Sequence, residues 1–166
     1  MSDKSQVIKE VVEHTGIFDF KSLYSFASRW FKDENYDVFE EKYQEKLAGN
    51  VREISIEWKC TKKLSDYFKY EIGVKWKISD LAEVEVEIEG KRKKSNKGKV
   101  NLEVKGTVIK DPDSQWDSGP LFRFLRDFYN KFVIPSRVMN TEEKLIGDVK
   151  SFKDEIKSFL ELSGRK

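Results

Sequence analysis

The chain has 166 residues, of which 37% are charged, yet its formal net charge is only +2. A chain of this length is expected to form a domain with a full core. Because the net charge is small, the electric field of the whole protein is too weak to attract a charged partner, and such a partner must be bound by a local charged patch. The single cysteine, Cys60, excludes an internal disulfide and indicates a reducing compartment.

We expect no targeting segment in this chain. The N-terminus has no long apolar core typical of a signal peptide, and no stretch approaches the roughly 20 apolar residues that span a bilayer. We therefore expect a cytoplasmic protein with a single domain over residues 1–166. The abundance of Lys and Glu is also typical of heat-adapted proteins.

Two helical patterns open the chain. Val7, Ile8, Val11 and Val12 have the spacing of a short amphipathic helix, so residues 1–18 are predicted to be a peripheral helix or a flexible arm. Asp19 is placed to cap a second helix over residues 20–32, whose apolar residues cover nearly half of its surface.

Five strand-like runs follow, at residues 37–47, 51–60, 67–78, 83–91 and 98–109. Apolar and polar residues alternate in them, which predicts strands with one buried and one solvated face. Because the connections are short, consecutive strands should pair antiparallel as a meander. The residues expected to share one core are Ile56, Trp58, Val74, Trp76, Val86 and Val104.

The hairpin formed by the last two runs carries the strongest local charge asymmetry. Glutamates alternate with apolar residues over residues 83–89, and six cations follow in the predicted connecting tip: Lys91, Arg92, Lys93, Lys94, Lys97 and Lys99. Such a cluster can neutralise phosphates or lie against an anionic surface. A lysine-rich turn is more often an ordinary solvated loop, and that is the favoured interpretation of this run.

Two helices are predicted after the sheet, over residues 118–134 and 141–164. The first has apolar residues around half of its circumference. The second has a narrow apolar seam of Leu145, Val149, Phe152, Ile156 and Phe159, which we expect to cover the first. The predicted fold class is α+β: a five-stranded antiparallel meander sheet with an N-terminal helix or helices and two C-terminal helices packed on its apolar face.

Few residues suggest catalysis. His14 is the only histidine, and Cys60 shares a strand face with Trp58, which favours an inert core thiol. Carboxylates are abundant, and this abundance is the only reason to consider them for acid–base chemistry. The candidates are the pairs Glu40–Glu41 and Glu142–Glu143 and the glutamates of residues 83–89. No phosphate-binding loop or metal-ligand spacing occurs, so we predict no catalytic residues, no metal site and no cofactor.

The sequence is compatible with three functions. The first is that of a small non-enzymatic binding or adaptor domain, which recognises a protein or an anionic macromolecule by surface shape and charge. The second is a carrier, because a curved antiparallel sheet closed by a long C-terminal helix resembles the helix-grip architecture of hydrophobic-ligand carriers. Its apolar cavity would be lined by Trp58, Trp76, Phe124 and Phe128. The third is weak nucleic-acid binding through the basic hairpin. A hydrolase that uses carboxylates is less favoured, because the histidine chemistry is missing.

Overall fold

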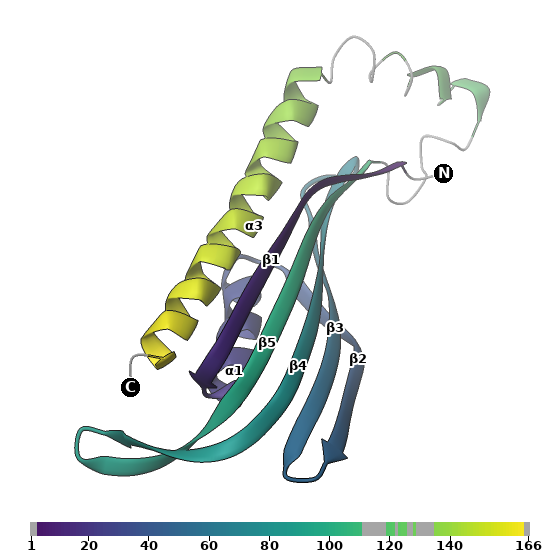
Figure 1. The fold of residues 1–166 in the computed structure, drawn as a ribbon. Helices are drawn as coiled ribbons and strands as arrows, with labels where there is room; N and C mark the ends of the chain where they lie inside the picture. The colour runs from purple at the N-terminus through teal and green to yellow at the C-terminus, as the bar shows by residue number, and fades with distance from the viewer. Residues whose placement is uncertain (1–2, 111–118, 122, 126–127, 129–134, 165–166) are drawn as a thin grey trace.

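The computed structural model describes residues 3–110, 119–121, 123–125, 128 and 135–164. Its five strands form one antiparallel sheet in the order β1-β5-β4-β3-β2 (Figure 1). This confirms the α+β class with a five-stranded antiparallel sheet and helices. In chain order the elements are β1 (Asp3–Phe18), α1 (Phe20–Asp33), β2 (Asp37–Ala48), β3 (Val51–Lys63), β4 (Phe68–Ile88), β5 (Lys91–Lys110) and α3 (Pro135–Gly164).

The N-terminal segment is a strand, so the prediction of a helix around Val7–Val12 is wrong. β1 pairs antiparallel with β5 from Asp3 opposite Lys110 to Phe18 opposite Asn96. The segment is rich in β-branched residues, which favour a pleated, half-buried surface over a helix. β5 offers a long edge for pairing, and these ladder hydrogen bonds outweigh the weak local helical spacing. The helix α1 then connects the two edge strands of the sheet, β1 and β2.

The strands β2 to β5 follow one another as the predicted meander, but β4 is much longer than expected. The predicted runs 67–78 and 83–91 are one strand, interrupted by a bulge rather than by a turn. Ser79 lies opposite Lys99 and Ala82 lies opposite Lys97, so β4 holds one residue more than β5 in this interval. Asp80 has a positive φ of 56°, which accommodates the extra residue.

The bulge reverses which residues of β4 face the core. Beyond it Glu83 lies opposite Asn96, whereas Val86 lies opposite Lys93. Val86 is only partly buried and lies outside the core cluster, so the prediction that it joins the core is wrong. The other predicted core residues, Ile56, Trp58, Val74, Trp76 and Val104, are all buried there.

Both helices pack on the same face of the sheet, which we call the inner face. α1 buries Phe20, Leu23, Ala27 and Phe31. The predicted seam of the last helix is confirmed for Leu145, Val149, Phe152 and Ile156, which are buried, while Phe159 is partly buried and stacks on Phe26 at 5.0 Å. α3 begins earlier than the expected start near Thr141, and it contacts β1, β5 and α1.

The backbone of β5 allows α3 to approach closely at Gly106. A Cβ there would lie 2.9 Å from Ile8 Cγ2 and 3.2 Å from side-chain atoms of both Leu145 and Val149. A larger residue at this position would therefore displace these three side chains where β1, β5 and α3 meet.

The predicted helix 118–134 lies largely outside the described residues. Its described positions 120, 121, 123–125 and 128 are helical, and Arg123 N–H donates to Gly119 O at 3.0 Å. Leu121 and Phe124 are 66% and 65% exposed. The last helix, α3, was expected to cover the apolar side of helix 118–134. Its described residues instead contact β1, β5 and α1, and the side chains of Leu121 and Phe124 are not buried beneath α3.

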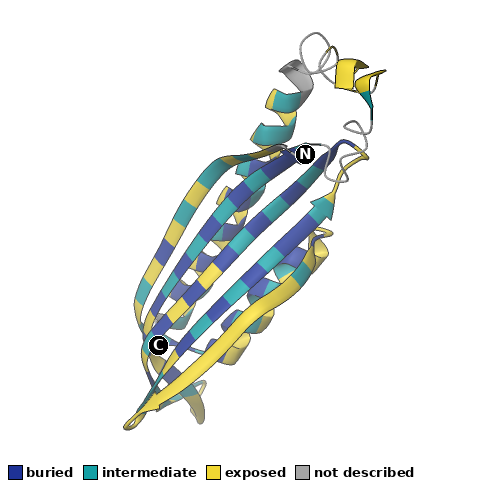
Figure 2. Cartoon of the chain, turned by 90° about the vertical axis from the view of Figure 1, so that its right-hand side faces the viewer, coloured by how far each residue is buried: buried dark blue, intermediate teal, exposed yellow. Residues whose placement is uncertain are grey.

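The edge strand β2 is the exposed part of the sheet. Figure 2 shows β2 exposed along most of its length, while buried and less buried residues alternate in the strands beside it. A bulge between Glu40 and Lys42 places Phe39 opposite Lys59 on the outer face, but Tyr43 opposite Ile56 on the inner face. α3 covers the inner face over β1 and β5, and α1 covers it over Trp58 of β3 and Trp76 of β4. The inner face is open beside the second half of β2, at Tyr43, Glu45 and Leu47.

Candidate functional site

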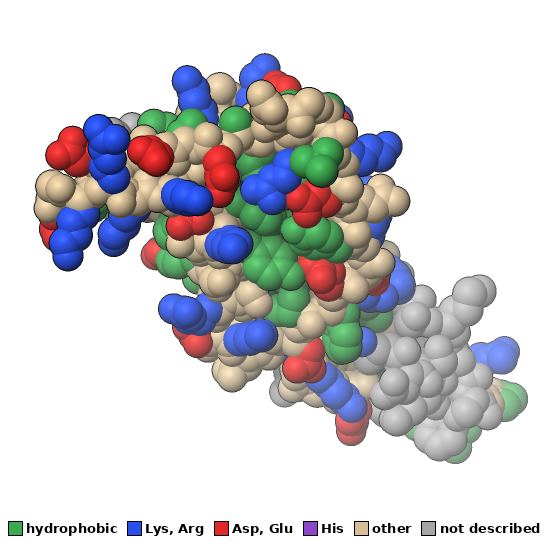
Figure 3. Space-filling view, turned by 90° about the horizontal axis from the view of Figure 1, so that it is seen from below, with side chains coloured by type: hydrophobic (Ala, Val, Ile, Leu, Met, Phe, Trp, Pro, Cys, Tyr) green, Lys and Arg blue, Asp and Glu red, His purple; other side chains and the backbone are tan. Residues whose placement is uncertain are grey.

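A cleft of about 1000 Å³ lies between the first turns of α1 and the inner face of the sheet, near the β2–β3 turn. Figure 3 shows this end of the molecule, with apolar side chains gathered in the middle and charged side chains around them. We call it the α1 cleft. It is lined by Asp19, Phe20, Lys21, Tyr24, Ser25, Tyr43, Glu45, Leu47, Asn50, Arg52, Leu81, Glu83, Lys94, Ser95 and Asn96.

The start of α1 forms one wall of the cleft and is held by two side chains. Asp19 is the N-cap residue, and it accepts hydrogen bonds from Ser22 N–H at 3.5 Å and Ser22 Oγ at 2.9 Å. Asn96, on β5, accepts a hydrogen bond from Phe20 N–H at 3.1 Å and is only 8% exposed. Asn96 therefore ties the first residue of the helix to the sheet.

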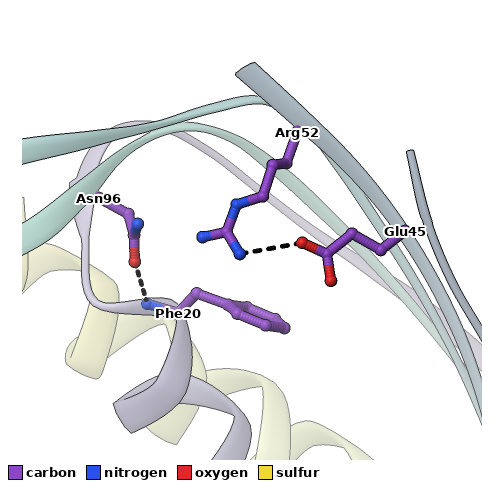
Figure 4. Close-up of polar contacts among 4 residues, drawn as sticks. All are labelled: Phe20, Glu45, Arg52 and Asn96. Carbon is purple, nitrogen blue, oxygen red and sulfur yellow. Dashed lines mark hydrogen bonds and ion pairs between the residues drawn. The ribbon is translucent and has the colours of Figure 1, made fainter. Parts of the chain in front are cut away.

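The sheet supplies an ion pair on the opposite side. Arg52, on β3, donates to Glu45 Oε1, on β2, at 2.9 Å. Figure 4 shows the side chains of Phe20, Glu45, Arg52 and Asn96 pointing into the same space from four different elements. The bulge in β4 contributes Glu83 to this site, because it turns that residue to the face on which Asn96 lies.

Behind the cleft lies an aromatic cluster that Tyr24 connects to it. The ring of Tyr24 lies 5.2 Å from that of Trp58 and 6.1 Å from that of Trp76. Tyr24 OH donates to Glu40 Oε1 at 2.6 Å, and Trp58 Nε1 donates to the same oxygen at 3.3 Å. Burial, together with the Glu40 carboxylate, raises the pKa of Tyr24 to about 12. Tyr24 is therefore a neutral donor at physiological pH.

The predicted cavity residues are not brought together as a group. Trp58 and Trp76 are 3% and 2% exposed, with ring centroids 5.0 Å apart. Phe124 and Phe128 are 65% and 50% exposed, with ring centroids 6.5 Å apart. The tryptophans belong to the packed core behind the α1 cleft, and the phenylalanines lie at the surface.

The basic hairpin differs from the predicted tip. Its turn is Glu89–Gly90, and the six cations, Lys91, Arg92, Lys93, Lys94, Lys97 and Lys99, lie along the first half of β5. Arg92 is opposite Glu87 and Lys94 is opposite Glu85, and Arg92 lies 3.6 Å from Glu85. Lys91 and Lys93 are instead opposite Ile88 and Val86. Positive charge is therefore partly neutralised on one face of the hairpin and not on the other.

The only histidine and the only cysteine lie apart from the cleft. His14, in β1, approaches Ile17 O at 3.4 Å through Nε2, and its ring packs edge-on against Phe18. Cys60 is fully buried, and this burial raises the pKa of its thiol to about 12. Within the described part of the chain, no group of three or more His, Cys, Asp or Glu residues is arranged to hold a metal ion.

Sequence reasoning missed the four residues shown in Figure 4 as a site. Asp19 was predictable as a helix cap, but Asn96 resembles ordinary turn chemistry in a lysine-rich run. Phe20 and Asn96 are 76 positions apart, and only the β1–β5 pairing makes them neighbours. One local feature could have indicated a special role for Asn96: it is the one amide side chain in a run that holds six cations.

No protein-family model matches the chain, and no curated protein matches it either. None of the helices in the described residues is long and apolar enough to cross a membrane. A functional assignment must therefore rest on the α1 cleft and the exposed surfaces themselves.

Proposed function

We propose that this protein is a non-catalytic binding protein that carries a small amphipathic molecule in the α1 cleft. The observation that carries the proposal is the cleft itself, which combines about 1000 Å³ of volume with aromatic and aliphatic walls and a few converging polar groups. Ligand sites have this composition: apolar walls supply binding energy, and a small number of polar groups fix the orientation.

Binding is favoured over catalysis by the chemistry of the lining. Neither His14 nor Cys60 lies in the α1 cleft. Glu45 is paired with Arg52, and Asp19 is committed to capping α1. The apolar wall formed by Phe20 and Leu81 is continuous with the core, since both side chains belong to the core cluster.

The test uses a neutral apolar fluorophore, N-phenylnaphthylamine, so that charge plays no part. We expect saturable binding with one site per chain. Ser25 is exposed on α1 and lines the cleft, so Ser25→Phe should fill the cleft and abolish binding. Gln44→Phe adds similar bulk to an exposed residue of β2 outside the cleft and should leave binding unchanged. Equal binding by both variants would overturn the proposal.

One observation favours a second function, the adaptor that recognises a macromolecule. β2 is an edge strand with three large apolar side chains exposed: Phe39 at 54%, Tyr43 at 44% and Leu47 at 78%. Exposed edges of this kind can receive a further strand. Phe39 is outside the α1 cleft, so Phe39→Ser should release a co-purifying partner, whereas Ser25→Phe should retain it. If Ser25→Phe releases the partner and Phe39→Ser retains it, the adaptor function is contradicted.

A further inference from the structure

We infer that the α1 cleft selects an amphipathic ligand whose polar head carries a single negative charge, with a carboxylate as the chemistry that fits best. This inference rests on the proposed function, because it names the head group of the same ligand. Its basis is an excess of unused hydrogen-bond donors in the cleft, presented by Asn96, Arg52 and two lysines.

The first unused donor belongs to Asn96. Its Oδ1 accepts from Phe20 N–H at 3.1 Å, and because an N–H group needs an acceptor, this contact fixes the orientation of the amide. The Nδ2 group is then directed away from Phe20 (Figure 4), and no described residue accepts a hydrogen bond from it. The side chain is more than nine-tenths buried and lines the cleft. This donor faces the cleft, so an oxygen of a bound ligand would supply its acceptor.

The second set of donors belongs to Arg52. A guanidinium carries five N–H groups, and the hydrogen bond to Glu45 uses Nη1. Figure 4 shows the guanidinium between the carboxylate of Glu45 and the amide of Asn96. Glu45 therefore holds Arg52 in place and leaves donors directed into the cleft. The planar guanidinium matches a carboxylate in two-point geometry better than an ammonium group does.

The charges of the lining define the charge of the head group. Asp19 and Glu45 are engaged, by Ser22 and Arg52, so only Glu83 is an unpaired carboxylate of the lining. Among the described residues, Lys21 and Lys94 pair with no carboxylate. The formal charges of the six charged lining residues cancel, so no net positive charge is available to offset the two charges of a phosphate monoester. The preference for one negative charge therefore rests on the unused donors of Arg52 and Asn96.

The experiment compares three ligands with the same chain and different heads: octanoate, octanol and octylammonium. Binding to the full chain is measured by isothermal titration calorimetry at low salt. We expect octanoate to bind about tenfold more tightly than octanol, the smaller end of what a charge-assisted hydrogen bond contributes. Octylammonium should bind more weakly than either.

Two variants separate the head group from the fold. Asn96→Asp keeps an acceptor for Phe20 N–H but replaces the donor by a negative charge, so it should abolish the preference for octanoate and favour octylammonium. Arg52→Gln should weaken octanoate about tenfold and leave octanol unchanged. Arg92→Gln is the matched control, because Arg92 also pairs with a glutamate, Glu85, but lies outside the cleft.

The outcomes distinguish the two proposals. If octanol binds as tightly as octanoate, or if Arg52→Gln and Asn96→Asp leave octanoate binding unchanged, the head-group inference is overturned and the carrier stands. If none of the ligands binds, and N-phenylnaphthylamine does not bind either, the carrier itself is wrong and the inference falls with it. Thermal unfolding of each variant shows whether a loss of binding reflects a loss of fold.

Discussion

The backbone of Gly98 passes so close to the β4 bulge that a Cβ atom on it would lie 2.9 Å from the carbonyl oxygen of Ser79. The carbonyl oxygen of Asp80 would be 3.1 Å away. The bulge reverses the faces of β4, and this reversal brings Glu83 to the α1 cleft beside Asn96. A glycine in β5 therefore permits the geometry of the candidate site.

Gly98→Ala should destabilise the protein by about 1–3 kcal/mol, the usual cost of forcing extra atoms into a packed site. The backbone atoms of Ser79 and Asp80 are the ones that must move, and they are less able to yield than the end of a side chain. Denaturant unfolding measures the change as a lower midpoint at constant slope.

Gly73→Ala is the matched control for this substitution. Gly73 also lies inside a strand, β4, but a Cβ there would meet no atom within 4 Å. Alanine should leave stability unchanged or raise it by about 0.4–1 kcal/mol, because it restricts the unfolded chain. If Gly98→Ala is tolerated as well as Gly73→Ala, the bulge does not depend on glycine.

The fold was predictable where the alternation of apolar and polar residues was unbroken, as in β3 from Ile54 to Cys60. It was not predictable in β1, because pairing with a distant strand decided between helix and strand there. Val86 shows the same limitation, since a single extra residue at 79–82 moved it out of the core. Local pattern does not show where a strand will bulge.

The candidate site was less predictable than the fold. Asp19 was identified as a cap from its position before an apolar helix. Two contacts of the site, the ion pair of Arg52 with Glu45 and the hydrogen bond of Phe20 N–H to Asn96, depend on how the strands are aligned with one another. That alignment cannot be predicted from a short stretch of sequence. Residues that converge from four elements become a site only when the sheet order is known.

Cys60 should react slowly with a thiol reagent in the native protein. It is fully buried, and burial raises its pKa to about 12, so the reactive thiolate is scarce and inaccessible near pH 8. Labelling with Ellman's reagent should accelerate only when denaturant unfolds the chain. Rapid stoichiometric labelling of the folded protein would show that the β3 core opens readily.

Alkaline pH should destabilise the protein through its buried tyrosines. Burial, and then the Asp148 carboxylate 2.9 Å from its hydroxyl, raise the pKa of Tyr36, and burial raises the pKa of Tyr70 to about 12. The folded state thus holds protons that the unfolded state loses near pH 10, the ordinary tyrosine value, so stability falls as pH rises above about 10.

Tyr36→Phe tests the source of this alkaline loss. The variant should lose about 1.5–3 kcal/mol near pH 7, the net contribution of a hydrogen bond to a charged group. Its free energy of unfolding should then decline less steeply than that of the wild type between pH 10 and about 12. Parallel curves for the two proteins would show that Tyr36 does not contribute to the alkaline transition.

The last prediction concerns the two faces of the basic hairpin. Lys91 and Lys93 lie opposite Ile88 and Val86, whereas Arg92 and Lys94 lie opposite glutamates. If the hairpin contacts RNA or another polyanion, the contact should be weak, independent of sequence and steeply salt-dependent, because each neutralised phosphate of duplex DNA adds about −0.9 to the log–log salt slope. Replacing Lys91 and Lys93 with Ser should reduce retention on heparin at low salt more than replacing Arg92 and Lys94, although both changes remove two charges. Equal losses would mean that only net charge matters, and no retention of the wild type would exclude the hairpin as an anion-binding surface.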